Sequence, residues 1–258
     1  MKYFVKEIQY LINEALVSYI DKNDASVYGE LRKTGFVIIP DFIKPTECEI
    51  LLNCMEEHMQ KSYAWHDPEG SDSRVSEIET VSAEFRDVFD KPWLANIYKK
   101  YISQFSCHHF IMANKVSYTD KNRGSGGGWH RDTVTRRQLK FLMYLNDVDE
   151  NTGCFQYIPA THTPFEKWKT NRLMNVGLDA SRYKDENIEK LLASNNYRVK
   201  NITGKAGTLI IVDSSGIHRG RPIKEGNIRY AATQYMSEDK FRSIVKEALG
   251  VVKLENNQ

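Results

Sequence analysis

The sequence contains no apolar run long enough to cross a membrane. A spanning helix needs about 20 predominantly apolar residues, whereas the opening segment MKYFVKEIQYLINEALVSYI carries charged residues among its apolar ones. We therefore expect neither a signal peptide nor a membrane anchor there, and we expect a cytoplasmic protein.

Cysteine is scarce, and no two cysteines form a CxxC pair. A disulfide framework and a zinc ribbon both depend on characteristic cysteine spacings. Neither is expected, and reduced thiols are predicted instead. The four cysteines are Cys48, Cys54, Cys107 and Cys154.

The chain also lacks an excess of charge of one sign, because 36 Lys and Arg residues oppose 34 Asp and Glu residues. Surfaces that bind nucleic acid or anionic membranes usually carry a marked basic excess. The near balance predicts a small-molecule partner, with no nucleic acid and no membrane, and leaves the oligomeric state open.

What is present is the composition of a folded chain. Hydrophobic residues make up 41% and aromatic residues 11% of the 258 positions, which suffices for a sizeable core. This length fits one large β-barrel or sandwich domain with added helices. We expect a single domain over residues 1–258.

The first part of the chain is predicted to be a mostly helical scaffold, residues 1–105. Apolar residues recur at helical spacing in three segments, and a β-rich run and a polar, aperiodic stretch separate them. The helical segments are 4–20, EILLNCMEEHM and 83–104, the β-rich run is GFVIIPDF, and the polar stretch, 61–80, is expected to be a loop.

Short β-rich runs follow, separated by Gly, Asn, Asp and Pro clusters, and such a series suggests a barrel or jelly roll. We expect a mainly β core over 106–236. A polar, partly helical insertion at 165–198 interrupts it, and a C-terminal helix at 237–258 follows it. The runs are FIMANKVSY, LKFLMYLNDV, CFQYIPA, GTLIIVD and RYAATQYM.

Three residues are candidate ligands for one metal ion: His130, Asp132 and His218. The first two form an HRD motif after a glycine-rich run and a Trp, and the third follows the strand GTLIIVD. Two imidazoles and one carboxylate leave open positions on a metal for a bidentate 2-oxo acid and O2. A His-x-Asp/Glu pattern is expected about once by chance in such a composition, so the spacing alone is weak evidence.

Arg229 is a candidate anion anchor, eleven residues after His218 and at the start of RYAATQYM. A buried guanidinium holds a carboxylate through two parallel hydrogen bonds. Arg219 and Arg221 lie nearer to His218 in the sequence, but neither is assigned as the anion anchor.

Residues 110–235 resemble the phytanoyl-CoA dioxygenase family of iron- and 2-oxoglutarate-dependent oxygenases. The matching motifs are GGWHRD, DENTGCFQYIPATH and GTLIIVDSSGIHRG followed by Arg229, and GFVIIPDFIKPTECEILL is also similar to the family's entry region. Thr152 and the pair Ala160-Thr161 depart from the family pattern. These departures lie in turns, so they leave the metal ligands intact and put the substrate in doubt.

The resemblance implies a mainly β fold with flanking helices around a double-stranded β-helix, a cupin-like jelly roll. It also implies that His130, Asp132 and His218 bind Fe(II) and that Arg229 anchors the cosubstrate 2-oxoglutarate, with O2 as the oxidant. Ser117 and Thr135 sit where related enzymes supply polar contacts to 2-oxoglutarate.

Alternation along LKFLMYL puts Lys140 on one face with Leu142 and Tyr144, and similar positions in the family point into the barrel. A lysine there is costly unless it pairs with an anion. Lys140 is therefore expected to bind the cosubstrate, or a carboxylate or phosphate of the substrate. By the same alternation Lys115 shares a face with Ser117, and it either lines the mouth of the site or is solvated.

The remaining chemical groups receive structural interpretations. In Cys107-His108-His109, neighbouring strand residues point to opposite faces and cannot chelate one ion together. His58, His66 and His162 are assigned to a helix, a loop and a turn outside the metal site. No G-x-S-x-G elbow is present, and the glycine run lacks the Lys-Ser/Thr of a phosphate loop.

Two alternative functions are consistent with the sequence. The resemblance implies a 2-oxoglutarate-dependent dioxygenase, an oxidoreductase that hydroxylates a C–H bond of a small metabolite and releases succinate and CO2. Asp132 takes the position that a chloride ligand needs in related halogenases, so hydroxylation is favoured, while desaturation and cyclisation stay open. The alternative is a non-catalytic metal- or ligand-binding β-helix module. The sequence does not identify the substrate.

Overall fold

Two antiparallel sheets form the centre of the protein in the computed structural model, which describes residues 26–103, 107–120, 124, 126–134 and 137–238. The larger sheet contains, in spatial order, β1 (Phe36–Ile39), β8 (Leu209–Asp213), β5 (Leu139–Tyr144), β10 (Ile228–Glu238), β4 (Cys107–Ser117), β3 (Asp72–Ser76) and β2 (Trp65–His66). The smaller sheet contains β7 (Lys200–Ile202), β6 (Phe155–Tyr157) and β9 (His218–Gly220).

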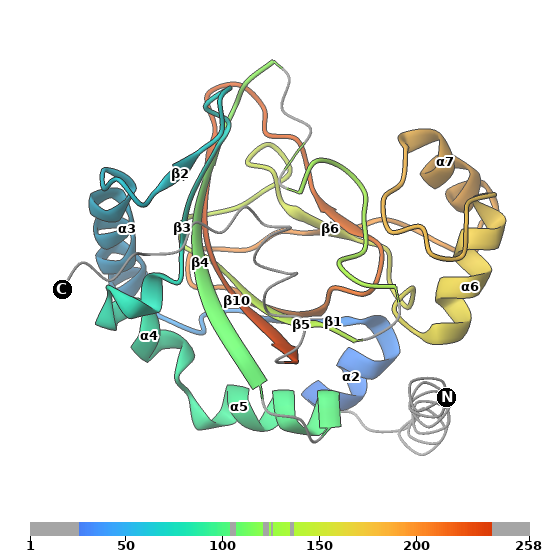
Figure 1. Ribbon diagram of the computed structural model, residues 1–258, viewed down its shortest axis with the longest axis horizontal. Helices are drawn as coiled ribbons and strands as arrows, with labels where there is room; N and C mark the ends of the chain where they lie inside the picture. Colours follow the sequence, from blue (N-terminus) through green and yellow to red (C-terminus); the bar gives the residue numbers. More distant parts are fainter. Residues whose placement is uncertain (1–25, 104–106, 121–123, 125, 135–136, 239–258) are drawn as a thin grey trace.

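Helices flank the sheets on two sides (Figure 1). The early helices include α3, which begins at Pro45, where the missing N–H breaks no helical hydrogen bond. Two later helices belong to the predicted insertion and lie on the side of the molecule away from α3. The early elements are α2 (Val27–Thr34), α3 (Pro45–Met59), η1 (Ile78–Thr80), α4 (Ala83–Phe89), α5 (Pro92–Tyr98) and η2 (Lys99–Ser103), and the insertion contains α6 (Pro164–Leu173) and α7 (Asp185–Ala193).

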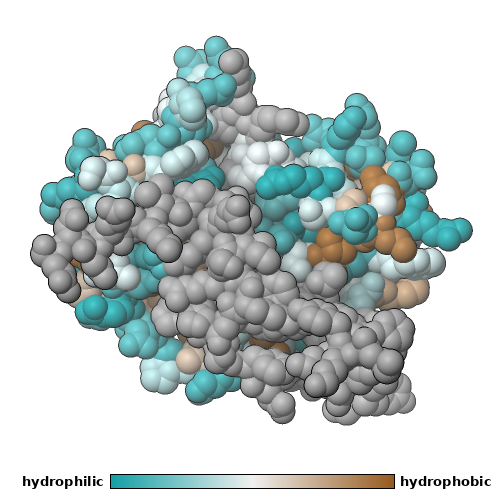
Figure 2. All heavy atoms as spheres, viewed as in Figure 1, coloured by the Kyte–Doolittle hydropathy of each residue, from teal (hydrophilic) through white to brown (hydrophobic). Residues whose placement is uncertain are grey.

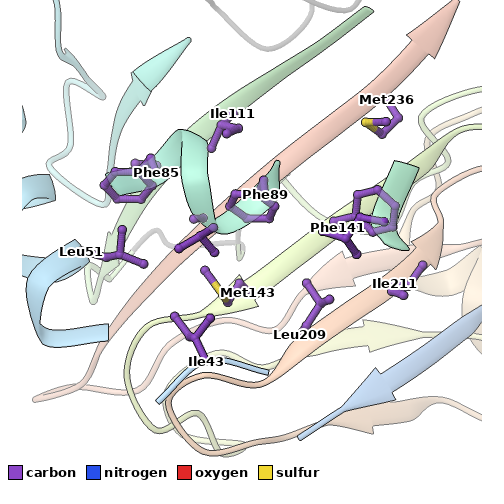
Figure 3. Close-up of a cluster of buried hydrophobic side chains, with 14 of the residues drawn as sticks. Ile43, Leu51, Phe85, Phe89, Ile111, Phe141, Met143, Leu209, Ile211 and Met236 are labelled. Atoms are coloured by element: carbon purple, nitrogen blue, oxygen red, sulfur yellow. The ribbon is translucent and has the colours of Figure 1, made fainter. Parts of the chain in front are cut away.

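The main core lies between the outer face of the larger sheet and the early helices (Figure 3). Phe141 and Met143 of β5 belong to this core with Leu51 of α3 and Phe85 of α4. Side chains alternate along each strand, so the intervening residues face the smaller sheet. Leu142 of β5 accordingly belongs to the second core, which lies between the two sheets.

The side chains of β10 alternate between the helix-covered core and a cavity on the other face of the sheet. Ala232 and Met236 pack into the helix-covered core, whereas Arg229, Thr233 and Tyr235 line a cavity on the opposite face. The register with β4 and β5 fixes this assignment over most of the strand, because a one-residue slip would turn every side chain over. One strand therefore serves both core and cavity.

Most predicted elements are confirmed, including the helix after Pro45, the helix in ENIEKLLAS and a strand in each β-rich run. The expectation of a loop over 61–80 is wrong, since β2, β3 and η1 lie there. β3 reads DSRVS, and charged residues at inward positions hide its period. The helical run 83–104 breaks before Pro92, and β7 and β9 were not expected. The helices predicted at 4–20 and 237–258 lie wholly or largely outside the described residues.

No helix within the described ranges is long and apolar enough to span a bilayer. Figure 2 shows apolar side chains at the surface on the side where Figure 1 places α6 and α7. The exposed large apolar residues of that insertion are Phe165, Trp168, Leu173 and Leu178.

Candidate metal centre

His130, Asp132 and His218 each offer one ligand atom, and these atoms all lie within 4.8 Å of one another. Oδ1 of Asp132 is 3.4 Å from Nε2 of His130 and 3.7 Å from Nε2 of His218. The two histidine segments are joined by a reciprocal pair of backbone hydrogen bonds, each 2.9 Å long. The fold thus brings together the three residues that the sequence predicted as one cluster.

Backbone carbonyls fix the orientation of both imidazole rings. Nδ1 of His130 lies 2.8 Å from the carbonyl oxygen of Gly128, and Nδ1 of His218 lies 2.9 Å from that of Gly216. A carbonyl only accepts, so each Nδ1 carries the hydrogen and each Nε2 is the ring atom that faces the cluster. Close packing supports this geometry, because a Cβ at Gly126 would lie 2.4 Å from the His130 ring.

The donor set fits one divalent metal ion. Nε2 of His218 is buried and has no hydrogen-bond partner, an arrangement that is costly unless another group binds the lone pair. Burial first, and then the neighbouring His130, hold the pKa of His218 well below its ordinary value, so its ring is neutral and available as a ligand. Two imidazoles and one carboxylate are a ligand set suited to Fe(II).

Lys140 pairs with the other oxygen of the Asp132 carboxylate, since its Nζ lies 2.5 Å from Oδ2. Burial alone would raise the pKa of Asp132, but the Lys140 ammonium and the two imidazoles hold it well below its usual range. The predicted inward direction of Lys140 is confirmed, because Lys140 and Leu142 line the same cavity. The anion that Lys140 meets in the structure is Asp132.

Arg131, between the two ligands of the HRD motif, is almost completely buried. Its guanidinium donates to the carbonyl oxygens of Thr161 and Ser215, to the Thr170 hydroxyl and to the Tyr183 hydroxyl. These partners come from the turn after β6, the segment before β9, and the insertion. Arg131 therefore ties the ligand segment to three other parts of the chain, a role that the sequence did not indicate.

Arg229 lines the same cavity as the three candidate ligands. One Nη donates to the carbonyl oxygen of Gly153, and the buried Nε has no hydrogen-bond partner. A buried guanidinium with unused donors fits an anionic ligand. Arg219 and Arg221 are instead paired with Asp185 and Glu150, so neither has the free, buried donors of Arg229.

The other predicted contacts are placed differently. Ser117, at the end of β4, is not among the cavity residues within the described part of the chain. Lys115 points to the helix-covered side, where it pairs with Glu56 of α3, so it does not line the mouth of the site. Thr135 lies outside the described residues.

The cavity also contains residues that the sequence did not single out. Alternation from Arg229 along RYAATQYM would have identified Thr233 and Tyr235, whereas Arg74 was hidden by the expectation of a loop. The described lining residues are Arg74, Met112, Asn114, Gly126, His130, Asp132, Lys140, Leu142, Phe155, His218, Gly220, Arg229, Thr233 and Tyr235.

The remaining histidines and cysteines lie outside this cavity as far as the structure describes them. His66 contacts Ser73 and the Met59 carbonyl oxygen, and buried His162 contacts the Arg32 carbonyl oxygen. The described thiols are unpaired: Cys48, Cys54 and Cys154.

The sequence model of the phytanoyl-CoA dioxygenase family matches residues 31–231. Among curated protein sequences, none matches the chain. Solved structures do share the fold. The carbocyclase SnoK from nogalamycin biosynthesis is 16% identical with a TM-score of 0.64, over 84% of this chain and 85% of that one.

Two further structures are similar. The epimerase SnoN, in complex with Fe3+, alpha ketoglutarate and nogalamycin RO, is 13% identical with a TM-score of 0.61, over 82% of each chain. EctD from S. alaskensis with bound Fe is 15% identical with a TM-score of 0.62, over 83% of this chain and 76% of that one. At these identities the likeness shows the fold, which is the double-stranded β-helix expected from the sequence.

Proposed function

The chain belongs to the phytanoyl-CoA dioxygenase family and is an oxygenase of the iron- and 2-oxoglutarate-dependent type; we propose that it hydroxylates a C–H bond of a small-molecule substrate. The observation that carries the proposal is the convergence of His130, Asp132 and His218 on one point of a cavity that Arg229 also lines. When bound, iron(II) with 2-oxoglutarate and O2 supplies an oxidant that removes hydrogen from carbon, with release of succinate and CO2.

In this proposal each residue has one task. Nε2 of His130, Nε2 of His218 and Oδ1 of Asp132 hold the metal, and the Gly128 and Gly216 carbonyls keep the rings in the required tautomer. Three protein ligands leave adjacent positions for the 2-oxo acid and O2. Arg229 donates to the distal carboxylate of 2-oxoglutarate through the guanidinium hydrogens that Gly153 leaves free.

The binding of iron and 2-oxoglutarate by SnoN, and of iron by EctD, supports these assignments. Because SnoN is an epimerase and SnoK a carbocyclase, the reaction differs between proteins of this fold. Hydroxylation is proposed ahead of halogenation because Asp132 supplies a carboxylate ligand where a halogenase needs space for chloride, and desaturation and cyclisation are the other outcomes of the same chemistry.

The test is the release of succinate and CO2 from 2-oxoglutarate with Fe(II) and O2. Asp132→Ala and His218→Ala should abolish it, while the exposed Asp147→Ala should turn over like the wild type. Succinate release that is equal in all four proteins would exclude the assignment. Metal binding without 2-oxoglutarate binding would favour the alternative, a non-catalytic binding module.

A further inference from the structure

Two of the cationic side chains that line the cavity, Lys140 and Arg229, lie toward opposite ends of β10. Tyr235 pairs in register with Lys140 on β5, and it is six residues from Arg229 on the same face of the strand. At a rise of about 3.4 Å per residue, the Cα atoms of Tyr235 and Arg229 are roughly 20 Å apart. Lys140 and Arg229 therefore contact different ligand groups in the cavity.

The charges around the metal position do not balance. Asp132 is the one carboxylate among the described lining residues, which include Lys140, Arg229 and Arg74. Arg74 is neutralised by Asp72, whose Oδ2 lies 2.5 Å from its Nη2. The two positive charges of a divalent metal equal the two negative charges of 2-oxoglutarate. The single negative charge of Asp132 is then the counter-charge for both Lys140 and Arg229. Among the described lining residues, one positive charge is left without a counter-charge, and burial makes that costly.

A second buried donor lies beside Lys140. The Tyr235 side chain is 6% exposed and lines the cavity. It stacks on Phe110 with ring centroids 4.9 Å apart, and the Lys140 Nζ lies 4.7 Å from its ring centroid. Its hydroxyl forms no hydrogen bond with any described residue. Buried tyrosine hydroxyls usually have a partner, so this one is available to a ligand.

We propose that Lys140 and Tyr235 form a subsite for an acidic group of the substrate, a carboxylate or a phosphate, at the end of the cavity opposite Arg229. The ammonium has three donors and forms an ion pair with the Asp132 carboxylate. The substrate's acidic group would accept from the ammonium and from the tyrosine hydroxyl, and it would supply the missing negative charge. This inference rests on the proposed function, and it restricts the substrate to acids.

The test uses protein loaded with Zn(II), which is redox-inert, and saturated with 2-oxoglutarate. The probes are acetate, propionate, benzoate and methyl phosphate, with acetamide, propionamide and benzamide as neutral counterparts. Saturation-transfer NMR measures each affinity and reports whether 2-oxoglutarate stays bound. We expect the acids to bind beside 2-oxoglutarate at least about tenfold more tightly than the amides, the usual effect of a charge-assisted hydrogen bond.

Lys140→Met and Tyr235→Phe should each weaken acid binding by about tenfold or more, and neither should change 2-oxoglutarate affinity by more than a few-fold. Tyr235→Phe is the safer variant, because it leaves the contact between Lys140 and Asp132 intact. The exposed Lys205→Met and Tyr118→Phe are matched controls and should behave like the wild type.

Three outcomes would overturn the subsite: equal binding of acids and amides, no binding of any acid, or acid binding that survives both substitutions. Failure of 2-oxoglutarate to bind the metal-loaded wild type would instead remove the proposed function, so the two failures are distinguishable in the same samples.

Discussion

The Arg131 guanidinium donates a 2.7 Å hydrogen bond from Nη2 to the Thr170 hydroxyl. Arg131 is the residue between the ligands His130 and Asp132, and Thr170 lies on α6 of the insertion. A hydrogen bond from a buried side chain therefore connects the insertion to the candidate metal centre, and the insertion helps to position the ligand segment.

Replacing Arg131 with Met should destabilise the protein strongly. Its guanidinium serves two carbonyl oxygens and two hydroxyls, and buried acceptors without donors cost about 1–3 kcal/mol each. We expect a loss of at least about 3 kcal/mol in the free energy of unfolding, measured by urea denaturation. Arg172→Met, on the exposed side of α6, should change stability by less than about 0.5 kcal/mol. Similar losses in both variants would contradict this role.

Metal binding should stabilise the folded chain through His130. A ligand at a hundred times its dissociation constant stabilises the native state by about 2.7 kcal/mol, so Co(II) should raise the melting temperature of the wild type. The His130→Ala variant should lose this shift, and the exposed His66→Ala should keep it. A shift that persists in His130→Ala would place the metal elsewhere.

Arg229→Met should weaken 2-oxoglutarate binding by about a hundredfold, because a charged bidentate contact in a buried site is lost. Anaerobic calorimetry on metal-loaded protein measures the affinity. Arg221→Met removes an arginine whose partner is the exposed Glu150 and should leave the affinity unchanged. If the Arg221 variant lost affinity and the Arg229 variant did not, the anchor would have been assigned to the wrong arginine.

Stability should fall in acid because of His162. Burial lowers the pKa of His162 from 6.5 to about 4, so the unfolded chain binds the proton more readily than the folded one. The stabilisation is complete above pH 6.5, and about 3 kcal/mol of it is lost as the pH falls to 4. Urea denaturation across this range should show a shallower slope for His162→Gln than for the wild type. Parallel curves would contradict the assignment.

The sequence predicted the metal ligands and Arg229 because these residues sit in local motifs at strand ends. Lys140 could also be directed inward, since LKFLMYL alternates over its whole length. Its contact with Asp132 could not be predicted, because it depends on how the HRD segment approaches β5 in three dimensions.

Two other features were beyond sequence reasoning for physical reasons. Arg74 lies on a short strand whose inward residues are charged, so hydrophobic periodicity gave no signal. Side chains alternate along the strand that contains Ser117, as expected. Lys115, which shares a face with Ser117, pairs with Glu56 on the helix-covered side of the sheet. Alternation defines two faces, and only a partner strand or helix shows which face is inside.

The two faces of β10 can be altered independently. Thr233 and Tyr235 line the cavity and Ala231 lies on the same face of the strand, while Ala232 and Met236 pack into the helix-covered core. A mutant library restricted to the first three positions would sample new substrates on an unchanged scaffold. Deleting a single residue from β10 would turn every side chain beyond the deletion to the opposite face, so within this strand new specificities are reachable by substitution and not by changes of length.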